Sequence, residues 1–209
     1  MKIMAIGAHF DDVELGVGGT LLKHQQKGDE IVIVVATKSD YRSPNGHQRK
    51  AKDALNEGKR SALRLGAKLV YLNNKTLLLQ ANADFVFALQ QIITDEKPDV
   101  IYTHFIHDQH TDHQAVAKAT LIGGREVDKI LFYRSNFYKT LDAFNENVVV
   151  DITPFIEAKK ELIALFKSEK EKISRWQNLF EAKARADGLT YGVDYAETFM
   201  LFWDKGHLK

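Results

Sequence analysis

The sequence predicts an α/β fold with three layers, Rossmann-like, in which helices cover both faces of a mostly parallel sheet. Short apolar runs rich in β-branched residues alternate with longer segments of helical character along the chain. The runs are continuous, as in strands that are buried on both faces, and the clearest of them covers residues 31–35. No repeat, linker or low-complexity segment interrupts the chain, so we expect a single domain over residues 1–209.

The first half of the chain supplies three strands and three helices in this scheme. We expect a strand at residues 2–7 and a helix that begins at Asp12 or Val13 and ends before Gly28. After the strand at 31–35, a polar loop from Thr37 to Gln48 has the composition of a surface turn. The next expected elements are a helix at 49–65, a strand at 68–72 and a helix at 84–96.

The second half continues the alternation. We expect a strand at 99–103, a helix at 112–121, and strands at 129–133 and 148–150. Thr153-Pro154 predicts a helix start, because threonine caps a helix and proline fits its first position. The long amphipathic stretch that follows is expected to break near Ser174 and to resume as far as Gly188. Residues 197–203 form the last expected strand.

Composition narrows the class of partner. A net charge of +1 gives no basic surface for nucleic acid or for an anionic membrane, which favours a small-molecule partner. No apolar run approaches the length of a membrane span or a signal peptide. The chain has no cysteine, which fits a cytoplasmic protein and means that any metal ligands come from His, Asp and Glu.

Histidine and carboxylate side chains follow two of the predicted strands. His9, Asp11 and Asp12 come after the first strand, and residues 110–113, His-Thr-Asp-His, come after the strand at 99–103. Parallel winding brings the carboxyl ends of neighbouring strands to one edge of a sheet, where ligands bind in open α/β folds. An imidazole and a carboxylate three residues apart can ligate one metal from one loop, which leaves the other carboxylate free for proton transfer.

At these two segments the sequence resembles the LmbE-like or PIG-L-like family of metal-dependent de-N-acetylases. That family carries Ala-His-Pro-Asp-Asp-x-Glu near its N-terminus, then a Gly-Gly pair, and His-x-Asp-His in mid-chain. Here Phe10 stands where the family usually has proline, and weaker resemblance extends to residues 56–66 and 194–199. The resemblance implies hydrolysis of the N-acetyl group of an N-acetylated amino-sugar or sugar conjugate.

The resemblance also implies roles for individual residues. Three side chains would bind zinc, or another divalent metal such as iron, and leave a position open for water: His9, Asp12 and His113. Asp11 would be the general base for that water. His110 would stabilise the oxyanion or protonate the departing amine, and Asp112 would orient His110 and hold it cationic. Spacing by itself shows only that ligation is feasible.

One family feature is missing. The family usually has an arginine three residues before the glutamate that Glu57 matches, and Ala54 occupies that place here. If that arginine organises the substrate pocket, another one has to replace it, and the sequence offers Arg42, Arg49 and Arg134.

Two other functions remain open at this point. One is a Rossmann-like small-molecule-binding module in which the His/Asp cluster is only structural, and the other is a metal-dependent hydrolase of a different ester or amide bond. The glycines at 16, 18 and 19 favour close backbone approach over dinucleotide binding, because His9 and Asp11 occupy the strand end where that fingerprint needs its first glycine.

The aromatic residues of the C-terminal third have two interpretations. They are compatible with a core or with the interface of a homo-oligomer, and three of them are candidate platforms for a sugar ring: Tyr138, Trp176 and Tyr191. His104 and His107 are expected to be surplus histidines or to pack beneath the site.

Overall fold

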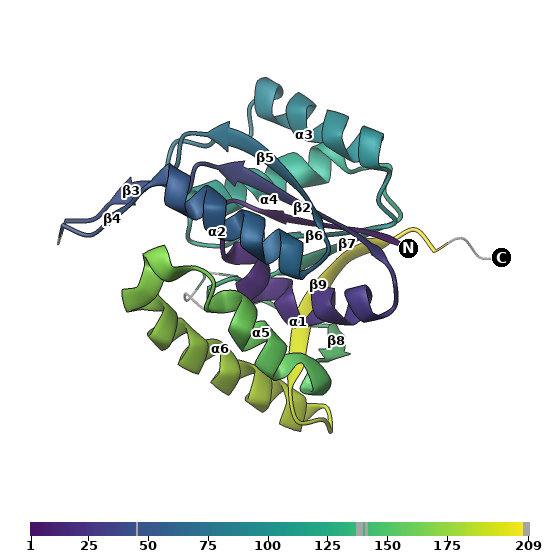
Figure 1. Ribbon diagram of the computed structural model, residues 1–209. Helices are drawn as coiled ribbons and strands as arrows, with labels where there is room; N and C mark the ends of the chain where they lie inside the picture. The colour runs from purple at the N-terminus through teal and green to yellow at the C-terminus, as the bar shows by residue number, and fades with distance from the viewer. Residues whose placement is uncertain (45, 137–139, 141, 207–209) are drawn as a thin grey trace.

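The computed structural model describes residues 1–44, 46–136, 140 and 142–206. Its main sheet has the strand order β5-β2-β1-β6-β7-β9-β8 (Figure 1). Five strands pair in parallel: β1 (Lys2–Gly7), β2 (Glu30–Thr37), β5 (Lys68–Asn74), β6 (Val100–His104) and β7 (Lys129–Tyr133). At one edge, β9 (Ala196–Asp204) runs antiparallel to both β7 and β8 (Val148–Asp151). The mostly parallel sheet confirms the predicted fold class.

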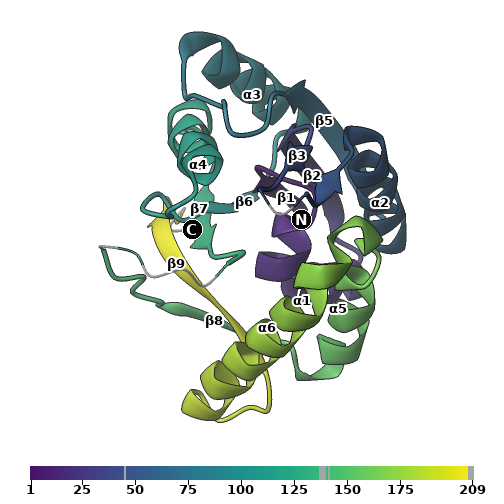
Figure 2. The ribbon, with the colours of Figure 1, turned by 90° about the vertical axis from the view of Figure 1, so that its left-hand side faces the viewer.

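Helices cover both faces of the sheet, as Figures 1 and 2 show. One face carries α1 (Asp12–Gln26), α2 (Ala51–Arg64), α5 (Ile156–Ile163) and α6 (Lys170–Thr190). The other carries α3 (Ala83–Glu96) and α4 (Thr111–Gly123). Ile3 of β1 faces the first of these cores and its neighbour Met4 faces the second, so the strand is apolar at both alternating positions. Among the described residues, no helix combines the length and apolarity that a membrane span requires.

Helix α1 lies close to Tyr133 of β7 because Gly16 has no side chain. A Cβ atom on Gly16 would lie 2.2 Å from the ring of Tyr133, whose hydroxyl donates to the Ile6 carbonyl at 2.9 Å. The expectation that these glycines serve close approach to the sheet is therefore confirmed at Gly16.

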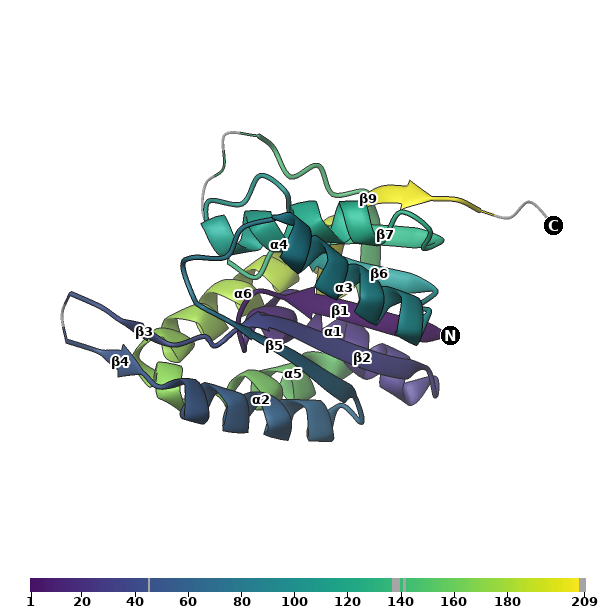
Figure 3. The same ribbon diagram turned by 90° about the horizontal axis from the view of Figure 1, so that it is seen from above.

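Two segments differ from the expected elements. The polar loop at 37–48 contains a hairpin of β3 (Tyr41–Arg42) and β4 (Gln48–Arg49), which extends away from the sheet in Figure 3. The expected break near Ser174 is wrong, because α6 runs through that residue. The chain turns earlier: a 3-10 turn, η1 (Thr153–Phe155), precedes α5, and a second one, η2 (Lys167–Glu169), precedes α6.

The earlier turn has a packing reason. Phe166, which lies between α5 and η2, is fully buried in the core cluster that also includes residues of α1 and α2. The turn also places Ser168 and Glu169 against the hairpin base, where they contact Arg49.

Candidate active site

The two His/Asp segments meet where the chain order of the sheet reverses. From β1 the chain builds outward to β2 and β5, then returns to place β6 on the other side of β1. The loops after β1 and β6 therefore lie side by side at the carboxyl edge, which is where open α/β sheets bind ligands. The loop after β1 is held by β2: the Thr37 hydroxyl donates to the Ala8 carbonyl at 2.8 Å, and the Phe10 N–H donates to Ser39 at 2.8 Å.

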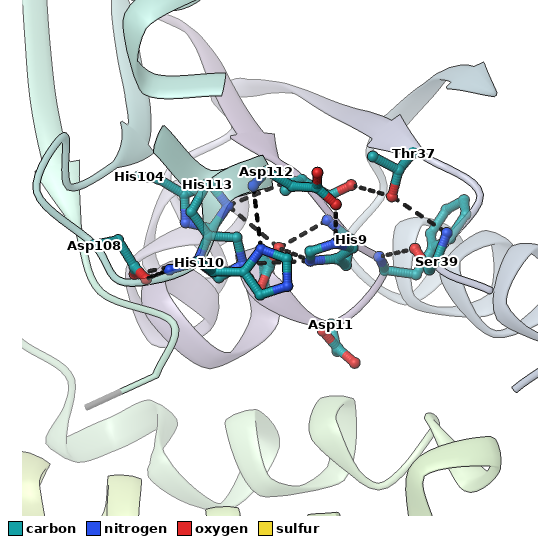
Figure 4. Close-up of polar contacts among 12 residues, drawn as sticks. His9, Asp11, Thr37, Ser39, His104, Asp108, His110, Asp112 and His113 are labelled. Carbon is teal, nitrogen blue, oxygen red and sulfur yellow. Dashed lines mark hydrogen bonds and ion pairs between the residues drawn. The ribbon is translucent and has the colours of Figure 1, made fainter. Parts of the chain in front are cut away.

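Three side chains with potential metal-binding atoms converge in these loops, and Figure 4 shows two of them, His9 and His113, close together. His9 Nδ1 lies 3.3 Å from His113 Nε2 and 3.3 Å from Asp12 Oδ2, and His113 Nε2 lies 3.3 Å from Asp12 Oδ1. Ligands that hold a tetrahedral zinc ion at about 2.0–2.1 Å are separated from each other by about 3.3 Å. The spacing of these three side chains fits such an ion.

One hydrogen bond, at His9, and one ion pair, at His113, determine which ring nitrogens face one another. His9 Nε2 lies 3.0 Å from Asp112 Oδ2, and His113 Nδ1 lies 3.1 Å from Asp108 Oδ2. A carboxylate accepts, so each of these nitrogens carries a ring proton; in the neutral form of the two rings, which is the form that binds a metal, the opposite nitrogens present lone pairs to the same point. Two carboxylate-held imidazoles aimed at one position are the usual support of a bound metal.

The charge around these rings also favours a cation. Burial alone would lower the pKa of His113, but the carboxylates of Asp12 and Asp108 outweigh it and raise the pKa to about 10. Burial likewise opposes ionisation of Asp12, yet His113 and His104 hold its pKa well below the usual range. The pocket therefore keeps a buried carboxylate ionised and stabilises positive charge beside it.

His104 comes within metal-binding distance of Asp12 and His113 but is unsuited to be a ligand. Its Nε2 accepts the backbone N–H of Ala8 at 3.0 Å, which uses the lone pair that faces the cluster. Burial lowers the pKa of His104 to about 4, and its ring stacks on His113 with centroids 3.9 Å apart. The expectation that this histidine packs beneath the site agrees with that position.

His110 lines the cluster with a defined tautomer. It is the N-cap of α4, and its Nδ1 accepts the backbone N–H of Asp112 at 3.2 Å, so the neutral ring carries its proton on Nε2. Burial and the neighbouring His9 lower the pKa of His110 to about 4. These contacts favour a neutral His110 ring, and the expected role of His110 stays a prediction.

Asp112 contacts His110 through its backbone N–H and His9 through its carboxylate. That carboxylate also accepts from the backbone N–H groups of Leu77, at 2.7 Å, and Leu79, at 3.2 Å. Because α4 begins between the two residues, the Asp112 side chain points towards the β5–α3 loop and the His9 ring.

The Asp11 side chain points away from the ring cluster in Figure 4, and its carboxylate accepts a hydrogen bond from Arg49 Nη1 at 3.0 Å. Its backbone has φ 119°, a region that non-glycine residues rarely occupy, so the next residue, Asp12, can face the rings while Asp11 faces the other way. Burial raises the pKa of the Asp11 carboxyl to about 7, although the nearby Arg49 guanidinium opposes the rise. A group with that pKa can both accept and return a proton near neutral pH.

A cavity of about 280 Å³ opens over these residues. Its wall includes His9, Asp11, His110 and His113, and its far side is built by the hairpin, η2 and α6: Tyr41, Arg42, Arg49, Glu169 and Trp176. Of the three candidate platforms, Trp176 lines the cavity, Tyr191 does not, and Tyr138 lies outside the described residues. Phe10 does not face the cavity but packs against α2 and Tyr71.

Sequence reasoning missed several residues of the site, among them Asp108 and Glu169. Asp108 holds His113, and Glu169 lines the cavity from η2. Asp108 lies in the same histidine-rich loop as His113. An acidic residue so close to a potential metal ligand could have indicated a carboxylate that supports the histidine. No sequence signal pointed to Glu169, because it belongs to a run of charged residues that is typical of a solvent-exposed helix face. The other motif acid, Glu14, accepts from Ser61 of α2 in the core and takes no part in the cavity.

Comparison with known proteins places the chain in a family. The chain is 37% identical over 142 residues to "Uncharacterized deacetylase YaiS" of Escherichia coli strain K12, covering 64% of this chain and 73% of that protein. It is 26% identical over 214 residues to the diacetylchitobiose deacetylase of Thermococcus kodakarensis, covering 91% and 78%. The structure of the conserved protein TT1542 from Thermus thermophilus matches with a TM-score of 0.82 at 22% identity, covering 95% and 93%, which shows the shared fold. The model of the PIG-L family, GlcNAc-PI de-N-acetylase, matches residues 4–122, which include both His/Asp segments, and the chain therefore belongs to this family.

Proposed function

We propose that the protein is a metal-dependent hydrolase that removes the N-acetyl group from an N-acetylated amino-sugar or a small sugar conjugate. The observation that carries the proposal is the convergence of His9, Asp12 and His113 on one point, with the unliganded carboxylate of Asp11 in the same cavity. Family membership supports amide hydrolysis, and two relatives bear the name deacetylase.

In this proposal His9, Asp12 and His113 hold zinc or another divalent ion such as iron. A divalent ion in that place supplies Lewis acidity, which acidifies water and polarises an amide carbonyl. Asp11 accepts the proton of the attacking water, and His110 donates its Nε2–H to the carbonyl oxygen as negative charge develops there. The amide C–N bond then breaks, and Asp11 returns its proton to the nitrogen, which gives acetate and a free amine.

The cavity favours a small substrate. Ligand pockets usually measure about 300–1,000 Å³, and this one, with about 280 Å³, lies just below that range. Trp176 offers an apolar face, and Tyr41 and Arg42 at the hairpin offer polar contacts. A single N-acetylated sugar ring with a short substituent is the substrate class that fits this combination.

The test combines metal analysis with acetate release. The purified protein is expected to bind about one divalent ion per chain and to release acetate from N-acetylglucosamine conjugates. Asp11→Asn is expected to lower kcat by about 10²–10⁴-fold, because the general base is lost, while the metal content stays unchanged. Equal activity in that variant would remove Asp11 from the mechanism.

The same measurements separate the alternatives. Two ions per chain with phosphoester hydrolysis would favour a different reaction at this site. No bound metal, no acetate release and a rise in melting temperature with nucleotides would indicate a binding module and contradict the proposal.

Asp108→Asn tests the support of His113. The amide no longer accepts as strongly from His113 Nδ1, so zinc affinity is expected to fall by about 10–100-fold, measured by competition with a chromogenic chelator. Asp142→Asn is the matched control, since Asp142 pairs only with the exposed His107 in the described contacts and should leave zinc affinity unchanged. Equal affinity of Asp108→Asn and the wild type would show that His113 needs no such support.

A further inference from the structure

Arg49 is a buried arginine that ends the protruding hairpin, and only 3% of it is exposed. Its Nη1 donates to Asp11 Oδ2 at 3.0 Å, and its Nε donates to the Ser168 hydroxyl at 3.0 Å. The guanidinium also lies 3.4 Å from Glu169 and 3.5 Å from Glu57. One side chain thus joins the loop after β1, the helix α2 and the turn η2.

The acids around Arg49 are themselves fixed. Glu57 accepts from Ser168 twice, from its backbone N–H at 2.7 Å and from its hydroxyl at 2.6 Å. Glu169 accepts from the Tyr41 hydroxyl at 2.7 Å. Glu57 and Glu169 are thus held where both of them pair with the guanidinium that reaches Asp11.

Asp11 needs such an anchor for two reasons. Its backbone conformation at φ 119° is one that non-glycine residues rarely adopt, so contacts have to hold the loop in it. Three carboxyl groups, from Asp11, Glu57 and Glu169, also surround one guanidinium, and without that cation they would repel one another in a buried site. The hydrogen bond from Arg49 to Asp11 holds the loop in its conformation, and the positive charge of Arg49 offsets the repulsion among the three carboxyl groups.

We infer that Arg49 is the positioning residue of the general base: it holds the Asp11 carboxylate in the direction from which it can take a proton from water. The inference rests on the proposed function, because it assigns Arg49 a role through Asp11. It also accounts for Ala54, which is fully buried where the resembling family has an arginine, since the guanidinium reaches Glu57 from the hairpin instead of from α2. Arg42 is exposed and Arg134 does not line the cavity.

A double-variant cycle in the metal-loaded protein tests this role. Arg49→Met is expected to lower kcat by about 10²-fold, the size of effect that a misplaced catalytic group produces, with KM changed far less. Arg49→Lys, which keeps a cation, is expected to recover part of the loss. In the Asp11→Asn background, Arg49→Met should add less than about threefold, because the group it positions is already absent. Zinc content should stay unchanged throughout, since Arg49 contacts none of the three potential ligands.

Arg64→Met is the matched control, because that exposed arginine lies at the far end of α2 from the cavity and pairs with Glu161. Equal kcat in Arg49→Met and the wild type, or a full additional loss in the Asp11→Asn background, would overturn the inference. If Arg49→Met does not fold, the same cycle with Arg49→Lys decides. A wild-type protein that binds zinc and releases no acetate overturns the proposed function itself, a result distinct from either outcome for Arg49.

Discussion

His113→Ala is expected to abolish both metal binding and acetate release. His113 Nε2 faces both of the other potential ligands at 3.3 Å, so its loss leaves two ligands, which do not hold a catalytic zinc ion. The expected fall in zinc affinity exceeds about 100-fold, the upper end of what loss of an outer partner such as Asp108 causes. Metal content after dialysis and a chelator competition measure the first effect, and acetate release in excess zinc measures the second.

The control is another histidine of the same segment. His107 is exposed, stands six residues earlier and pairs with Asp142 at 3.0 Å, so His107→Ala should keep the wild-type zinc content and activity. A His113→Ala protein that still binds one zinc ion with wild-type affinity would show that the metal is held elsewhere. Removal of His113 also leaves Asp108 buried without its imidazole, so the melting temperature of the variant should be recorded beside its metal content.

The metal-binding part of the site could be predicted because its chemistry is local. His9 and Asp12 stand three residues apart in one loop, and the second segment stands at the end of a strand that parallel winding brings next to the first. Side-chain type, spacing and position at the carboxyl edge of the sheet were sufficient to predict the potential metal ligands. The partner of Asp112 could not be predicted in this way, since the direction of a side chain at a helix start depends on the capping geometry of α4.

The Arg49 network lay beyond sequence reasoning for a different reason. Its members come from three segments that are distant in the chain, and neither spacing nor periodicity relates them. The hairpin that delivers Arg49 consists of two-residue strands in a polar segment, too short to give an alternating pattern. The sequence did show that the arginine usual in the family is missing at Ala54, and Arg49 was one of three arginines that could replace it.

A second buried ion pair explains the terminal motif around Glu197. Its carboxylate does not reach the cavity; it accepts the backbone N–H groups of Gly19 and Thr20 at 2.8 and 2.7 Å. Lys159 of α5 donates to Glu197 at 2.7 Å and to the Leu15 carbonyl at 2.7 Å. These contacts bind the middle of α1, the helix that begins at Asp12, to α5 and β9. Glu197 therefore holds in place the helix that presents a potential metal ligand.

Glu197→Ala is accordingly expected to destabilise the protein by about 3–5 kcal/mol, because it leaves the buried Lys159 ammonium without a counter-charge. Urea unfolding followed by circular dichroism measures the loss. The Glu197→Ala/Lys159→Met protein should lose less than the two single variants together, since no unpaired charge remains in it. Glu181→Ala is the matched control: Glu181 also pairs with a lysine of α5, but that pair is about one-third exposed and should contribute only about 0–1 kcal/mol. Equal losses in Glu197→Ala and Glu181→Ala would mean that burial of the first pair adds nothing to stability, and that packing alone holds α1 against α5.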